Sequence, residues 1–171
     1  MKVTVEEAAA ILKRGGIVAV PTETVYGLAA DAANQAAVLR IFEAKHRPPD
    51  NPLICHLPTA AAIERFAAAP PSWVEQFWPG PLTVLLPHKN NLAPAVTAGS
   101  RFCAFRIPNH PVMLALLRLA ETPLSAPSAN TSGRVSPVNA AMVENDLGDT
   151  IDGILDGGPC AVGLESTIVQ P

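Results

Sequence analysis

A cationic loop with the sequence KHRPPDNPL, residues 45–53, has the composition of an anion site. Lys45 and Arg47 lie two residues apart, and two prolines follow Arg47 directly. Because proline fixes its own φ and biases the preceding residue towards an extended backbone, this loop holds its two cations in place. A stiff cationic loop that leads into the apolar run 53–57 predicts an anion site, with phosphate as the most suitable ligand. Taken alone, the motif also fits a solvated basic turn.

Three further polar loops could contribute to the same site. PTETVYGL, residues 21–28, follows an apolar run and offers two Thr hydroxyls and a Tyr, while GLEST, residues 163–167, lies near the end of the chain. SANTSG, residues 128–133, offers hydroxyls and an Asn ahead of a helix expected from Ser136, where free N–H groups and the helix dipole favour phosphate. Open α/β sheets bind ligands where polar loops follow strands, although each of these loops also fits an ordinary polar turn.

Arg106 and His56 are two titratable side chains expected on strands. Arg106 lies in the segment FRIP, and a charge on a half-buried strand is costly unless an anion pairs with it. An acidic side chain and a bound carboxylate would serve equally well. His56 follows the cationic loop, and a histidine in such a run is more often a satisfied core residue than a ligand.

The elements that must position these residues alternate between helices and strands. Helices are expected at 5–14, 35–44, 59–68, 111–121 and 136–145, with a short one from Ser72. Strands are expected at 17–20, 53–57, 82–86, 102–107, 124–126, 151–155 and 167–169. Along the segment 102–107, alternation places Phe102, Ala104 and Arg106 on one face of the strand. This order predicts one α/β domain with a central mixed β-sheet.

Composition narrows the class of protein. A chain of 171 residues fits one domain, and its net charge of −3 argues against a general nucleic-acid coat. The three cysteines are odd in number and show no CxxC spacing, which indicates neither a disulfide framework nor a zinc site and favours a reducing cytoplasm. The start, MKVTVEEAAAILKRGG, is typical of an amphipathic segment rather than a signal peptide, and no apolar run is long enough to span a membrane. P-loop, GxGxxG, GxSxG and HExxH motifs do not occur.

Six motifs carry a resemblance to a known family: PTETVYGL, AKHRPPDNPLICH, FWPGPLT, FRIPNHP, SAPSANTSG and GLESTIV. From about residue 15 onwards, the chain resembles the YrdC-type threonylcarbamoyl-AMP synthases. The resemblance implies a YrdC-like domain over residues 1–171, with a twisted mixed β-sheet and flanking helices around a large concave cavity. It also implies the reaction of L-threonine, bicarbonate and ATP to threonylcarbamoyl-AMP and pyrophosphate. A downstream threonylcarbamoyl transferase would then modify the adenosine beside the anticodon of tRNA.

The resemblance also implies roles for individual residues. Lys45 and Arg47 would be catalytic, near the reacting phosphate and carbonate. The residues implied to bind ATP are Arg47, Asn51, Ser128, Asn130 and Ser136. The residues implied to bind threonine are Thr24, His56, Arg106, Ala126 and Ser166, with Arg106 on the threonine carboxylate. Mg²⁺ would arrive with ATP, and neither a protein metal site nor a prosthetic group is expected.

Family chains continue past STIV with a further strand and an LRPG-like segment whose Arg contacts the nucleotide. The resemblance therefore implies a domain truncated at its C-terminal end, with weakened ATP binding and intact threonine binding. Two alternatives remain open at this point: an RNA-binding module, and a carbamoyl-transfer domain of a larger maturation protein. A weak contact with tRNA is expected as well, and no membrane partner.

Overall fold

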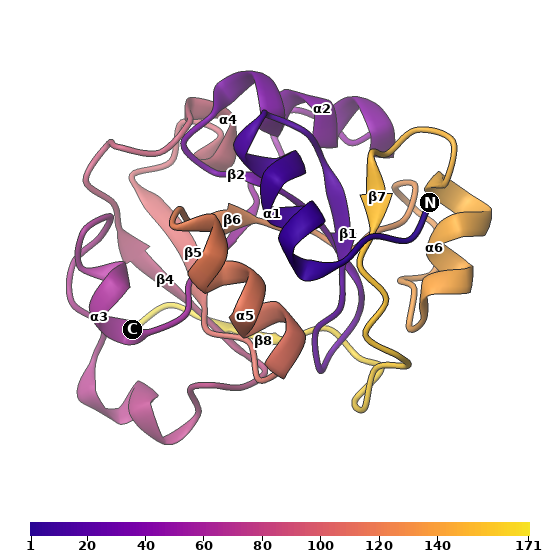
Figure 1. Cartoon of the computed structure of the whole chain (residues 1–171). Coiled ribbons are helices and arrows are strands. Elements are labelled where there is room, and N and C mark those ends of the chain that lie inside the picture. The colour runs from indigo at the N-terminus through magenta and orange to yellow at the C-terminus, as the bar shows by residue number, and fades with distance from the viewer.

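A mixed eight-stranded sheet forms the centre of the molecule, and the computed structural model describes all of residues 1–171 (Figure 1). The strands follow the order β7-β1-β2-β6-β3-β5-β4-β8. They are β1 (Val18–Val20), β2 (Gly27–Asp31), β3 (Ile54–His56), β4 (Leu82–Pro87), β5 (Phe102–Arg106), β6 (Leu124–Ser125), β7 (Gly153–Ile154) and β8 (Thr167–Val169). Three neighbouring pairs are parallel, namely β1–β7, β3–β5 and β4–β8, and the other four are antiparallel. The predicted mixed α/β fold is confirmed.

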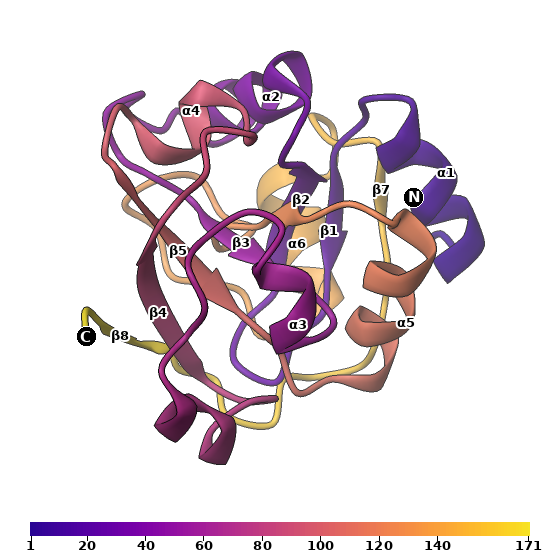
Figure 2. The ribbon, with the colours of Figure 1, turned by 90° about the vertical axis from the view of Figure 1, so that its left-hand side faces the viewer.

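Six α-helices and one 3₁₀ turn pack around the sheet. They are α1 (Val5–Lys13), α2 (Gln35–Lys45), α3 (Ala60–Ile63), the 3₁₀ turn η1 (Ser72–Gln76), α4 (Pro94–Thr97), α5 (Pro111–Ala120) and α6 (Ala140–Leu147). Helices α1 and α5 lie side by side in both views (Figures 1 and 2), and their apolar residues share a core with Val18 and Val20. Ala19 points the opposite way, into a larger core shared with α2, α4 and α6. Alternation along one strand thus supplies two apolar layers.

Local signals placed the first two helices correctly. The Thr4 hydroxyl accepts a hydrogen bond from the backbone N–H of Glu7, and the Glu7 carboxylate accepts one from the N–H of Thr4. This is the capping box that the sequence predicts at the start of α1. Helix α2 begins after Asn34, whose side chain accepts from the N–H of Ala37, and ends where His46 turns left-handed with φ 50°.

Two predicted helices had wrong bounds. The helix predicted from Ser136 begins only at Ala140, because Asn139 is the residue that caps it, and the backbone before Asn139 contacts other segments instead. The helix predicted over 59–68 stops at Ile63, since the N–H of Ala68 donates to Pro87 at the end of β4.

Strand β2 was missed altogether. Its sequence, GLAAD, consists mostly of small residues with a weak preference for strands. It nevertheless pairs with β1 on one side and β6 on the other. Pairing on both edges outweighs the weak local preference. No helix of the molecule is both long enough and apolar enough to cross a membrane.

Candidate active site

A cavity of about 540 Å³ opens on one face of the sheet, over the strands β3, β5, β4 and β8. Phe102, Ala104 and Arg106 of β5 line it, whereas Cys103 and Phe105 point into the core behind them. This is the alternation predicted for the segment 102–107. The three lining residues span about 13 Å of strand, at roughly 3.3 Å per residue. The cavity is therefore long enough for a ligand with two separate polar groups.

The cavity brings together most of the predicted site residues, although they come from segments far apart in the sequence. Eight of them line it: Thr24, Arg47, Asn51, His56, Arg106, Ala126, Ser128 and Ser166. Lys45, Asn130 and Ser136 do not line it. The ligand that each residue binds stays a prediction.

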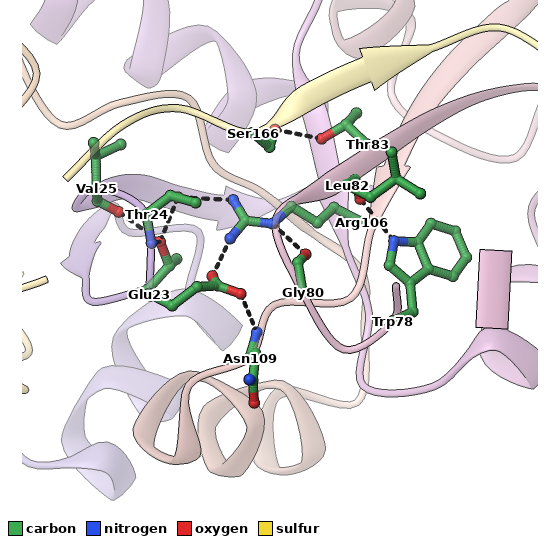
Figure 3. A network of polar contacts seen from close by, with 11 residues as sticks. Glu23, Thr24, Val25, Trp78, Gly80, Leu82, Thr83, Arg106, Asn109 and Ser166 are labelled. Atoms are coloured by element: carbon green, nitrogen blue, oxygen red, sulfur yellow. Dashed lines mark hydrogen bonds and ion pairs between the residues drawn. The ribbon is translucent and has the colours of Figure 1, made fainter. Parts of the chain in front are cut away.

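Arg106 lies at one end of this cavity, where three protein groups hold its guanidinium (Figure 3). Its Nε donates to the Gly80 carbonyl at 3.2 Å, its Nη1 donates to Thr24 Oγ1 at 2.9 Å, and its Nη2 pairs with Glu23 Oε1. Only 4% of Arg106 and 8% of Glu23 are exposed to solvent. Three of the five N–H donors of the guanidinium are thus used within the protein, which leaves two for a ligand.

Glu23 was not predicted as a site residue. Its second oxygen, Oε2, accepts a hydrogen bond from the backbone N–H of Asn109 at 2.6 Å. A signal was present, because the sequence already required an anion for Arg106 and offered Glu23 as the acid of PTETVYGL. Since 83 residues separate the two side chains, the sequence pattern alone did not join them.

Thr24 presents a defined hydrogen-bonding character to the cavity. The Thr22 hydroxyl donates to the carbonyl of Val25 at 2.7 Å and lies 2.9 Å from the Thr24 hydroxyl. Since the single proton of Thr22 is used, Thr24 donates to Thr22 and accepts from Arg106. Thr24 can therefore offer a ligand only an acceptor.

His56 is buried next to Arg106 on the paired strands β3 and β5. Burial, helped by the positive charge of Arg106, lowers the pKa of His56 to about 3. Its Nδ1 is buried and has no hydrogen-bond partner. At neutral pH, His56 is an uncharged group on the cavity wall and can only exchange hydrogen bonds with a ligand.

Ser166 and Ala126 complete this end of the cavity. The Ser166 hydroxyl lies 2.7 Å from the hydroxyl of Thr83, which is fully buried on β4 (Figure 3). The backbone N–H of Ala126 donates to the Ile54 carbonyl at 3.1 Å, so the Ala126 carbonyl is the group left for a ligand.

The cationic loop forms the other polar end. Arg47 is half-buried, and its guanidinium donates to the carbonyls of Asn51 at 3.2 Å and Pro52 at 2.9 Å. The loop thus closes on its own arginine, and its stiffness stays a prediction. Ser128 lies on the same cavity, and Glu165 brings a carboxylate to it.

Lys45 lies under this loop rather than on it. It is the last residue of α2 and only 1% exposed, and its Nζ donates to the carbonyls of Ser128 and of Asn130, the latter at 2.6 Å. Burial, together with the charge of Arg47, lowers the pKa of Lys45 to about 8. The prediction that both cations belong to the loop was wrong for Lys45, which ends α2 and ties the segment 128–130 to that helix.

The SANTSG segment does not meet a helix N-terminus, because α6 begins only at Ala140. Asn130 instead lines a separate hollow of about 490 Å³ beside α6, and its amide donates to the carbonyls of Thr131 and Arg134. The Ser136 hydroxyl donates to Glu165 Oε1 at 2.7 Å. Ser136 therefore reaches the cavity only through a residue that lines it.

Tyr26 was the remaining polar candidate of PTETVYGL, and that expectation was wrong. The side chain is fully buried, and its hydroxyl donates to the Gly158 carbonyl at 2.7 Å and accepts from the N–H of Gly157 at 3.1 Å. Burial raises its pKa to about 12. Tyr26 thus anchors the segment after β7. No group of three or more His, Cys, Asp or Glu side chains is arranged to hold a metal ion.

Comparison with known proteins agrees with this geometry. The Sua5/YciO/YrdC family model, described as "Telomere recombination", matches residues 10–171. A threonylcarbamoyl-AMP synthase of Bacillus subtilis is 48% identical over 97% of this chain and 49% of its own length. One from Xanthomonas oryzae is 39% identical over 90% of this chain and 86% of its own.

A structure of Pyrococcus abyssi Sua5 complexed with L-threonine superposes with a TM-score of 0.94 at 44% identity, over 98% of this chain and 50% of that one. E. coli YciO, at 18% identity and a TM-score of 0.86, shares the fold. The chain spans about half the length of the B. subtilis and P. abyssi relatives that it matches. By sequence over nearly its whole length and by structure, the chain belongs to the Sua5/YciO/YrdC family.

Proposed function

We propose that this chain joins L-threonine, bicarbonate and ATP into threonylcarbamoyl-AMP, releasing pyrophosphate and water. One observation carries the proposal: a single cavity has an arginine with two free N–H donors at one end and the proline-rich cationic loop around Arg47 at the other. The first suits an amino-acid carboxylate and the second suits phosphate groups. The likeness to P. abyssi Sua5 with bound L-threonine supports the same assignment.

At the amino-acid end, the two free N–H donors of Arg106 would bind the threonine carboxylate in a bidentate manner. Thr24 would accept from the threonine amino or hydroxyl group, since its own proton is committed to Thr22. Ser166, the neutral His56 and the carbonyl of Ala126 would supply the remaining hydrogen bonds.

At the phosphate end, Arg47, Asn51 and Ser128 would bind the triphosphate, with Mg²⁺ arriving on ATP as part of the substrate. Lys45 would contribute positive charge next to this end. It would also hold the carbonyls of Ser128 and Asn130 in place. Asn130 and Ser136 would contribute only after a change in their present partners, because neither lines the cavity.

The reaction asks little covalent chemistry of the protein. The threonine amine would attack the carbonyl carbon derived from bicarbonate, with loss of water, to give a carbamate. A carbamate oxygen would then attack the α-phosphorus of ATP, and the bond to pyrophosphate would break. Holding the three reactants in line and neutralising the phosphate charge would supply most of the acceleration. We further propose that the product is passed to a downstream transferase that modifies tRNA. A weak contact of this chain with tRNA and a cytoplasmic location are part of the same proposal.

Pyrophosphate release measured with and without L-threonine tests the proposal. Release that requires ATP, bicarbonate and threonine together is the expected result. Release driven by carbamoyl phosphate without threonine would instead indicate a carbamoyl-transfer domain. RNA binding that weakens steeply with salt, in the absence of any turnover, would indicate an RNA-binding module.

A further inference from the structure

Glu23 is a buried carboxylate next to the amino-acid end of the cavity. It does not itself line the cavity. Its neighbours Thr22 and Thr24 both line it, whereas the Glu23 side chain points to Arg106 and to the backbone of Asn109 (Figure 3). Both of its oxygens are occupied by protein donors. Glu23 is therefore available to orient a ligand-binding group but not to bind a ligand.

We propose that Glu23 is a positioning residue that fixes the guanidinium of Arg106 for binding of the substrate carboxylate. This inference rests on the proposed function, because it names how the amino-acid end of the same site is organised. Glu23 makes the only charged contact among the three that hold Arg106, the other two being a hydroxyl and a carbonyl. Loss of that contact leaves the guanidinium held by two neutral acceptors alone, the Gly80 carbonyl and the Thr24 hydroxyl.

The anchoring of Glu23 makes this role specific. Oε2 accepts from the N–H of Asn109, which lies two residues before the first residue of α5, and the carbonyl of Glu23 accepts from the N–H of Val162 at 2.8 Å. Glu23 is thus fixed at its side chain by Asn109, three residues after Arg106, and at its backbone by Val162 near the end of the chain. An arginine held by such a support loses less side-chain freedom when a ligand binds.

A purely structural role makes the opposite prediction. If Glu23 served only to neutralise a buried cation, a bound carboxylate could replace it, and a variant without the Glu23 charge would bind threonine equally well or more tightly. If Glu23 positions Arg106, the same variant binds threonine more weakly. The sign of the change in threonine affinity separates the two roles.

Calorimetric titration of L-threonine and of ATP into Glu23→Gln is the decisive experiment. Glutamine is isosteric but can accept from only one of Arg106 and Asn109, since its NH₂ group meets the other donor. We expect the dissociation constant for threonine to rise at least tenfold while that for ATP stays within twofold of the unaltered chain. An unchanged or lower threonine constant would overturn the inference.

Glu23→Asp keeps the charge and shortens the reach by one methylene, so it tests position alone and serves if Glu23→Gln does not fold. We expect weakened threonine binding in this variant too, and full affinity would equally overturn the inference. Asp152→Asn is the matched control, because Asp152 also accepts from one arginine, Arg40, and from one backbone N–H, that of Ile17, outside the cavity. It should bind threonine normally.

Threonine binding by the unaltered chain distinguishes a failure of this inference from a failure of the proposed function. If the unaltered chain does not bind threonine, with or without ATP, both fail. If it binds threonine and both Glu23 variants bind it with the same constant, only the role of Glu23 fails.

Discussion

Arg106 and Arg47 both line the cavity, but Arg106 is held by groups from distant segments and Arg47 by carbonyls of its own loop. The partners of Arg106 lie between 26 and 83 residues away, whereas those of Arg47 lie four and five residues away. Arg106 is buried and paired with a carboxylate, while Arg47 is half-buried. We therefore expect Arg106 to couple binding to the stability of the fold, and Arg47 to serve binding and turnover alone.

Arg106→Ala tests the first half of this comparison and has the largest expected effect. The substitution leaves Glu23 buried without its cation, which should lower the free energy of unfolding by about 3–5 kcal/mol. Urea unfolding followed by circular dichroism measures it. The double variant Glu23→Gln, Arg106→Met should recover a substantial part of the loss, because neither residue is then charged. A single-variant loss below about 1 kcal/mol would contradict the coupling.

Arg47→Ala tests the second half. Removing one charge from an anion site should cost about 2–4 kcal/mol of transition-state stabilisation, that is, roughly a 30- to 1000-fold decrease in pyrophosphate release. The free energy of unfolding should change by less than about 1 kcal/mol, as for most surface substitutions. Near-normal turnover would remove the loop from the mechanism. Arg134→Ala, in an exposed ion pair outside this cavity, is the control.

The pH dependence of stability should report the buried state of His56. Because the pKa of His56 is about 3 in the folded chain and about 6.5 in an unfolded one, the unfolded chain binds more protons between these values. Stability is therefore lost as pH falls below about 6.5, by about 2 kcal/mol between pH 7 and pH 5 from this group alone.

Unfolding of His56→Asn, measured at both pH values, should lack that component of the loss. His46→Asn should retain it, since His46 is exposed and asparagine tolerates its left-handed backbone. An identical pH dependence in His56→Asn and the unaltered chain would mean that His56 is charged in the fold.

Thr83→Val has the smallest expected effect and sharpens the comparison at the same end of the cavity as Arg106. Valine has the shape of threonine but leaves the Ser166 hydroxyl without its partner at 2.7 Å. We expect the free energy of unfolding to fall by about 1 kcal/mol. A loss of 3 kcal/mol or more would show that Thr83 supports more than this one hydroxyl.

Short-range signals were sufficient for several features. The capping box of α1, the alternating faces of β5 and the start of α5 at Pro111 all depend on residues within a few positions of each other. Such features follow from backbone geometry and neighbouring side chains, so they can be predicted without knowing where the chain goes next.

The start of α6, the existence of β2, the burial of Lys45 and the partner of Arg106 depended on the tertiary structure. In each case, groups far apart in sequence compete with or complete the local preference: β6 pairs with the small residues of β2, and Glu23 meets Arg106 across 83 positions. The sequence by itself determined that a cation on β5 required an anion. Only the folded chain decided which anion it is, because the energy of a buried charge pair depends on distance in space and not on separation along the chain.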